Sequence, residues 1–227
     1  RKVESAGLVL EALENVPLKF YDQVMLGGPD RDRQIENMVY TVRNIARAGI
    51  PIFGYHWMPT LVGRTSLSTK NRAGSLVTSF DLEEANREPL LRERRYSVEE
   101  MWENLEYWIK IIIPVAEEEG IRTGIHPCDP PVEYLKGIPQ LFRSFDAYKR
   151  LISIVESPAN CIEFCQGTFS EMADAKDDGI YEMIEYFGRR GKILYVHFRN
   201  VSDTVPKFRE EFINTGHVDM YKAMQSY

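Results

Sequence analysis

The chain has 227 residues, of which 44% are hydrophobic and 27% charged, and its formal net charge is −6. This length and composition suit a globular protein with one large domain, and the charge is spread along the chain without the basic stripe of a nucleic-acid-binding protein. No stretch contains the roughly 18 to 20 apolar residues of a membrane helix. We therefore expect a cytoplasmic enzyme for a small molecule, with neither nucleic acid nor membrane as a partner. The odd count of three cysteines fits a reducing compartment.

The first third of the chain alternates strand and helix patterns. Residues 1–6 resemble the last turns of a helix, and Gly7 follows where a glycine often ends one. Residues 8–15 predict a strand. Residues 30–48 predict a helix, because apolar residues recur along one face, and residues 50–57 predict the next strand.

The middle of the chain does not continue this alternation of strand and helix patterns. Residues 60–96 are polar and lack a clear period, and they are far longer than a usual connection. We expect an inserted loop or lid there. Ser97 and Glu100 have the spacing of a capping box, so a helix should begin at this point. It should extend to about residue 119 with a kink near Pro114.

The last part of the chain returns to alternating elements. They are a strand ending at His126, a helix over residues 145–155, a strand ending at Cys165, a helix over residues 180–190, and a strand ending at His197. Without the insertion, strand ends recur every 30 to 40 residues, roughly the size of a βα unit. Residues 218–224 then begin a helical pattern that has no C-terminal cap.

These units predict an α/β fold of the TIM (β/α)8 barrel type, present as a fragment of about five to six βα units. We expect one domain over residues 1–227, truncated at both ends. An open doubly wound sheet is the alternative, but no glycine-rich phosphate-binding fingerprint follows any strand.

Three consecutive predicted strands end on side chains that can bind a metal ion: His126, Cys165 and His197. The carboxyl ends of parallel strands meet at one edge of a sheet or barrel, where active sites are built. Imidazole and thiolate groups favour first-row transition metals, whereas calcium and magnesium prefer oxygen ligands. The pattern predicts a metal site. The alternative is that each residue is simply buried with a satisfied hydrogen bond.

Five further residues are candidates for substrate chemistry. Asp129 and the pair Arg199 and Asn200 follow two of the strand ends, and Arg64 lies in the predicted insertion. We expect these four to bind substrate, since a guanidinium can hold a carboxylate with two hydrogen bonds. His56 ends an earlier strand and is the candidate acid or base. The alternatives are a loop cap for Asp129, a surface ion pair for Arg199 and a packing role for His56.

Several segments together resemble the mannonate dehydratase family. They are His-Pro-Cys-Asp-Pro-Pro at residues 126–131, Phe-Cys-Gln-Gly-Thr-Phe-Ser-Glu at residues 164–171, Val-His-Phe-Arg-Asn-Val at residues 196–201, and shorter matches at residues 31–37 and 216–220. The resemblance runs in order through nearly the whole chain. Cys128 departs from the aspartate that the family commonly has at its position, and His217 stands where an acidic residue or asparagine is frequent.

The resemblance implies a barrel similar to the xylose-isomerase-like proteins. It also implies dehydration of a sugar acid, D-mannonate, to 2-keto-3-deoxy-D-gluconate in hexuronate catabolism, with Mn²⁺ or Fe²⁺ as cofactor. The family's ligands are two histidines, a cysteine and an aspartate. The first three correspond to His126, Cys165 and His197, and we expect the aspartate in a segment after Tyr227. A sugar isomerase or epimerase and an inactive metal-binding fragment are the alternatives, and a homo-oligomer is compatible with the sequence.

Overall fold

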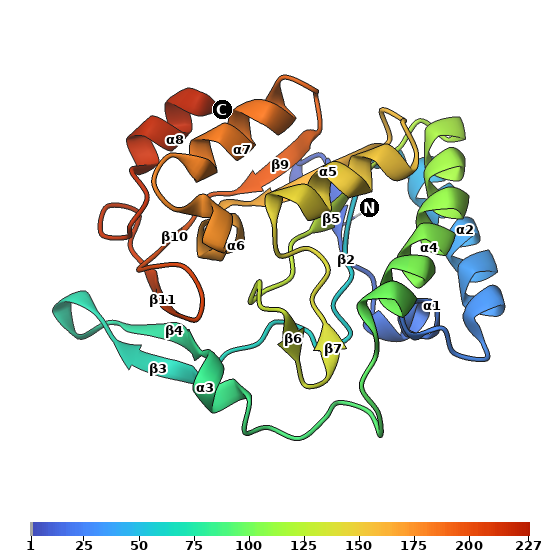
Figure 1. The fold of residues 1–227 in the computed structure, drawn as a ribbon. Helices are drawn as coiled ribbons and strands as arrows, with labels where there is room; N and C mark the ends of the chain where they lie inside the picture. The colour runs from blue at the N-terminus through green and yellow to red at the C-terminus, as the bar shows by residue number, and fades with distance from the viewer. Residues whose placement is uncertain (1) are drawn as a thin grey trace.

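The structure, a computed structural model, describes residues 2–227. Its centre is a curled sheet of five parallel strands in the order β1-β2-β5-β8-β9 (Figure 1). These strands are β1 (Ala12–Glu14), β2 (Ile52–His56), β5 (Arg122–His126), β8 (Asn160–Cys165) and β9 (Ile193–His197). Their order in space is their order in the chain. An open doubly wound sheet reverses direction at a switch point, so the half-barrel arrangement confirms the predicted fold class.

Helices cover the outer face of this sheet, as Figure 1 shows. They are α2 (Arg31–Arg47), α4 (Val98–Glu118), α5 (Phe145–Ile154) and α7 (Gly179–Gly188). Helix α1 (Asp22–Leu26) packs against α2 and α4, α8 (Met220–Ser226) packs against α7, and α6 (Gln166–Glu171) follows β8 directly at its carboxyl end. The predicted apolar face of α2 is buried at Ile35, Met38, Val42 and Ile45, because residues three and four apart share one side of a helix. The helix packs there against α4.

The residues at several helix ends form the caps that their local sequence favours. Ser97 and Glu100 form the capping box of α4, satisfying two backbone donors that the helix leaves free. Asp219 accepts hydrogen bonds from two backbone amides at the start of α8. A short 3-10 turn, Glu4–Ala6, ends at Gly7 with a left-handed φ of 74°. Residue 1 lies outside the described residues.

The predicted first strand is too long. Only Ala12–Glu14 pairs with β2, and the apolar residues before it, Leu8 and Val9, are exposed. Apolar content without a pairing partner does not make a strand, since the backbone needs a ladder for its hydrogen bonds.

Residues 60–96, the predicted insertion, contain regular structure that no periodicity in the sequence indicates. They contain β3 (Ser66–Lys70), β4 (Leu76–Asp81) and the short helix α3 (Leu82–Ala85). Strand β4 pairs with β11 (Lys207–Glu211), which pairs with β10 (Asn200–Val201), giving a four-stranded antiparallel sheet. This sheet lies below the half-barrel in Figure 1. The pairing spans more than 120 residues of sequence, so no local pattern announces it.

Smaller elements complete the fold. They are the β6 (Tyr134–Leu135) and β7 (Ile138–Pro139) hairpin and three further 3-10 turns at Leu18–Phe20, Arg72–Gly74 and Ala173–Ala175. One large apolar core lies between the half-barrel and its helices, and a second, small core contains Phe80 and Phe208. Among residues 2–227, no helix has the length and apolarity needed to cross a membrane.

Candidate metal centre

The sheet register brings the three predicted metal ligands together. Strand β8 ends beside β9 with Cys165 opposite His197, and His126 ends the neighbouring β5. One ligand atom from each of the three side chains lies within 4.8 Å of the other two. This convergence follows from parallel strands of similar length ending at one edge.

The hydrogen bond of His126 leaves its other ring nitrogen free to bind a metal ion. Nδ1 lies 2.7 Å from the carbonyl oxygen of Pro127. A carbonyl can only accept, so Nδ1 carries the proton and donates. In a neutral imidazole, Nε2 then presents its lone pair. Backbone orientation of a ligand histidine in this way is typical of metal sites.

Without a bound ion, the three side chains shift the pKa values of one another. Burial alone raises the pKa of the Cys165 thiol, but the charge and hydrogen bonds of His126 and His197 lower it well below its usual value. Burial lowers the pKa of His126, and the thiolate overcomes this and raises it to about 10. Hydrogen bonding to Cys165 raises the pKa of His197 to about 9. A thiolate stabilised in this way is the form that binds metal ions.

Two carboxylates that the sequence interpretation did not single out border this group. Glu14, at the end of β1, lies with Oε2 2.9 Å from Nε2 of His197. Glu163 has a fully buried side chain, and its Oε1 lies 3.4 Å from Nε2 of His197 and 3.9 Å from Nε2 of His126. Burial raises the pKa of Glu163 to about 7.

The position of each of these two carboxylates in the sequence could have indicated that it borders a site. Glu14 ends a parallel strand, as the three predicted ligands do. Glu163 lies two residues before Cys165 and therefore on the same face of β8, because side chains alternate along a strand. A glutamate in an otherwise apolar strand seldom stays buried without a partner, and this makes it a marker of a site.

Beside the metal ligands lies a set of charged side chains that we call the arginine–carboxylate cluster: Arg64, Asp129, Glu171, Arg199 and Glu210. Arg64 reaches Asp129 with two hydrogen bonds, 2.5 Å from Nη1 to Oδ1 and 2.9 Å from Nη2 to Oδ2. Arg199 Nη2 donates to Asp129 Oδ2 at 3.0 Å and to Glu171 Oε1 at 3.0 Å. The hydroxyl of Thr168 links the cluster to the metal ligands, lying 3.2 Å from both Asp129 Oδ2 and Cys165 Sγ.

The pKa values of the two buried carboxyls of this cluster shift in opposite directions. Burial would raise the pKa of Asp129, but the hydrogen bonds and charges of Arg64 and Arg199 lower it below its usual value. Burial and the charge of Asp129 raise the pKa of Glu171 well above its usual value. The two pKa values shift in opposite directions because two adjacent buried carboxylates repel each other, and the guanidinium groups lie closest to Asp129.

The structure thus joins three of the four predicted substrate-binding residues, Arg64, Asp129 and Arg199. Nη1 of Arg199 is buried and makes no hydrogen bond with any described residue, although it lies 3.7 Å from Oε1 of Glu210. Glu171 is not one of the predicted substrate-binding residues, but its side chain is fully buried against Arg199.

Asn200 and His56, the other two candidates for substrate chemistry, are not members of the arginine–carboxylate cluster. The Asn200 amide donates to the carbonyls of Ile213 and Val218 and its oxygen accepts from the amide of Val201, so it ties loops together. Its role in substrate binding stays a prediction. His56 ends β2 opposite His126, and its Nδ1 accepts from the amide of Met58 at 3.3 Å. Burial lowers the pKa of His56 to about 4, so the ring is neutral near pH 7.

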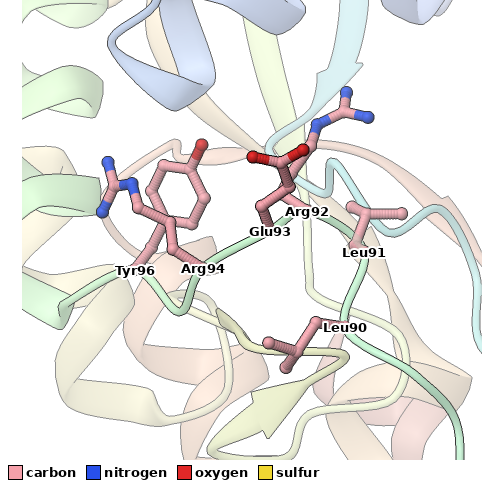
Figure 2. Close-up of a pocket in the computed structure, with 6 residues that line it drawn as sticks. All are labelled: Leu90, Leu91, Arg92, Glu93, Arg94 and Tyr96. Atoms are coloured by element: carbon pink, nitrogen blue, oxygen red, sulfur yellow. The ribbon is translucent and has the colours of Figure 1, made fainter.

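A large surface hollow lies elsewhere. It has a volume of about 970 Å³ and is formed by one loop, with Leu90, Leu91, Arg92, Glu93, Arg94 and Tyr96 as its lining (Figure 2). None of the strand-end residues or members of the arginine–carboxylate cluster lines it. The volume of a surface hollow therefore does not identify the candidate active site in this molecule.

Comparison with known proteins agrees with this geometry. The family model described as D-mannonate dehydratase (UxuA) matches residues 1–94 and 84–227. The mannonate dehydratase of Thermotoga petrophila is 32% identical over 99% of this chain and 71% of its own length. Mannonate dehydratase 2 of Halalkalibacterium halodurans has the same identity and coverage.

Solved structures give the same relationship. The crystal structure of mannonate dehydratase from Streptococcus suis matches with a TM-score of 0.84 and 32% identity, over 99% of this chain and 65% of that one. A xylose isomerase domain protein from Planctomyces limnophilus matches with a TM-score of 0.59 at 13% identity, which shows a shared fold alone. The chain spans about two thirds of the length of the Streptococcus suis protein.

Proposed function

We propose, since this chain belongs to the mannonate dehydratase family, that it dehydrates D-mannonate with a divalent metal ion held by His126, Cys165 and His197. The convergence of these three side chains within 4.8 Å is the observation that carries the proposal. Two imidazoles and a thiolate suit a borderline first-row dication. We infer Mn²⁺ or Fe²⁺ rather than calcium or magnesium.

The reaction removes the proton at C2 of the sugar acid and the hydroxyl at C3, and water leaves. The enol product then becomes 2-keto-3-deoxy-D-gluconate. A proton next to a carboxylate is very weakly acidic, and a bound dication would supply Lewis-acid stabilisation of the resulting charge. Protein side chains would bind the substrate carboxylate and transfer the protons.

The arginine–carboxylate cluster supports binding of the substrate carboxylate. Nη1 of Arg199 has no hydrogen-bond partner among the described residues, and a guanidinium donor suits a carboxylate. Arg64 is held against Asp129 and adds positive charge to the same region. Asn200 is proposed as a further contact at the edge of the site.

His56 is the proposed acid or base. Because burial lowers its pKa to about 4, the ring can accept a proton near neutral pH but holds it weakly. Its position opposite His126 in the sheet register places it at the same strand edge as the metal ligands. Proton transfer by a positioned histidine contributes typically 10²- to 10⁴-fold to a rate.

Residues 60–96 are proposed as a lid that also supplies a side chain to the site. Arg64 precedes β3, and the pairing of β4 with β11 holds this segment beside Glu210. The cytoplasm is the proposed location, supported by three free, buried cysteines.

The test is an assay of the protein with D-mannonate and Mn²⁺, with detection of the 2-keto-3-deoxy acid. We expect product with the natural sequence and a loss of at least 100-fold with Cys165→Ser. Cys161→Ser is the matched control, because Cys161 is buried in the same strand but bonds to the carbonyl of Pro158. A ketose without any 2-keto-3-deoxy acid would identify a sugar isomerase instead, and metal binding without turnover would identify a binding protein.

A further inference from the structure

We infer that Glu163 is an additional oxygen ligand of the metal ion, so that β8 supplies two donors, Glu163 and Cys165, in place of one. This inference rests on the proposed metal site. It is distinct from the aspartate that the family resemblance places after Tyr227, because Glu163 is a residue of the described sheet.

The burial of Glu163 requires a compensating partner. Its side chain is fully buried, and neither carboxylate oxygen accepts a hydrogen bond from any described residue. An isolated ionised carboxylate is costly to bury, and such groups are generally paired or bound to a metal ion. A bound dication would supply the missing partner.

The distances fit a shared ion. Donor atoms about 2.1 Å from one ion, at angles of about 90° to 110°, lie about 3.0 to 3.4 Å apart. Oε1 of Glu163 is 3.4 Å from Nε2 of His197 and 3.9 Å from Nε2 of His126. The second of these nitrogens is the one that the Pro127 hydrogen bond leaves free. Glu163 also forms a second group of possible ligands with Glu14 and His197, whose ligand atoms lie within 4.8 Å of one another, so that His197 is common to both groups.

Two strand glycines make room for this carboxylate. A Cβ at Gly54 would lie 2.9 Å from Oε2 of Glu163 and would collide with the Tyr195 hydroxyl, and a Cβ at Gly124 would lie 3.0 Å from the Glu163 amide nitrogen. The two glycines are paired across β2 and β5. Glycine inside a strand often marks a close approach, and here the group that approaches is the carboxylate end of Glu163.

A structural alternative involves Tyr195. Its hydroxyl lies close enough to act on the pKa of Glu163, yet neither group makes a hydrogen bond of ordinary geometry. If Glu163 served only to pack with Tyr195, then removing either partner would have the same effect. Glu14 cannot replace Glu163 as a buried ligand, because its side chain is 39% exposed and its carboxylate is hydrogen-bonded to His197.

The experiment compares metal binding and metal-free stability in Glu163→Gln, Tyr195→Phe and Glu117→Gln. Glu117 is a suitable control carboxylate because it bonds to Ser157 at the opposite end of β8. Mn²⁺ affinity is measured by calorimetry on metal-free protein, and Co²⁺ absorption reports whether the Cys165 thiolate still binds.

We expect Glu163→Gln to weaken Mn²⁺ binding by at least tenfold, to keep the sulfur-to-cobalt band, and to melt no lower than the natural protein when metal-free. Tyr195→Phe and Glu117→Gln should change the affinity less than threefold. An unchanged affinity in Glu163→Gln, or an equal loss in Tyr195→Phe, would overturn the inference. If the natural protein binds neither ion, the proposed metal site itself is wrong, which is a separate outcome.

Discussion

Asp129 is the residue on which the arginine–carboxylate cluster depends. Its two oxygens accept hydrogen bonds from Arg64 and Arg199, and its side chain is 5% exposed. Burying a pair of charges gains little net stability, but removal of one partner leaves the other charge uncompensated. Loss of the Asp129 carboxylate would therefore destabilise the protein mainly because the buried guanidinium charges would lack a partner, and less because the attraction itself is lost.

For this reason Asp129→Asn should lower the free energy of unfolding by about 3 to 5 kcal/mol, the cost of breaking a buried ion pair. Urea denaturation followed by circular dichroism measures this change. Asp32→Asn is the control, since Asp32 is 73% exposed, and its effect should stay within about 0.5 kcal/mol. Equal midpoints for both variants would mean that the cluster does not stabilise the fold.

His56 should make the stability of the metal-free protein depend on pH. The unfolded chain binds its proton near pH 6.5, whereas burial lowers the pKa of the folded group to about 4. The stabilising contribution of the neutral ring is therefore complete above about pH 6.5. It is lost as the pH falls toward 4, because the unfolded state then binds more protons.

Replacing His56 by Gln should remove up to about 3 kcal/mol of this pH dependence between pH 6.5 and 4, the free-energy equivalent of the pKa difference. Unfolding in urea at several pH values, with a chelator present, compares the slopes of the two proteins. Parallel slopes would show that His56 takes up its proton equally in both states.

At the scale of elements, the antiparallel sheet is held by few side chains. Phe80 of β4 lies opposite Phe208 of β11, with ring centroids 5.7 Å apart, and both are buried in the small second core. This pair joins residues 60–96 to the C-terminal part of the chain. It also fixes the segment that carries Arg64.

Phe80→Ala should accordingly loosen this sheet before it affects the half-barrel. Loss of a buried phenylalanine costs about 3 to 5 kcal/mol, which exceeds what so small a core is expected to supply. Hydrogen exchange should become at least tenfold faster in β3, β4 and β11 and change little in β5. Leu76→Ala, at a side chain that is 61% exposed on the same hairpin, should leave all four strands unchanged.

At the scale of the whole molecule, the five-stranded sheet has two open edges. Within residues 2–227, β1 has three residues and pairs only with β2, and β9 pairs only with β8 and has half-buried residues throughout. Unpaired backbone groups at an edge can add another chain. The three inner strands, β2, β5 and β8, have neighbours on both sides.

We therefore expect a protein of these 227 residues to self-associate as its concentration rises, and amides in β9 to exchange at least tenfold faster than those in β5 when it is dilute. Analytical ultracentrifugation and hydrogen exchange test the two parts. A monomer at all concentrations with uniform protection would show that neither edge is available for pairing.

Much of the architecture could be predicted because its signals are local. The buried face of α2, the capping box of α4 and the strands that end at His126, Cys165 and His197 all follow from periodicity and cap chemistry within a few residues. The extent of β1 and the pairing of β4 with β11 could not be predicted, since they depend on partners distant in sequence.

The sequence by itself determined the alternation of strands and helices, the family resemblance and the identity of three candidate metal ligands, because parallel strands bring their ends to one edge. Only the tertiary structure decided that Arg64 and Arg199 both bind Asp129, and that Glu14 and Glu163 border the candidate metal site. Distances between side chains on different elements depend on sheet register and burial, and neither of these is encoded in the spacing of residues along the chain.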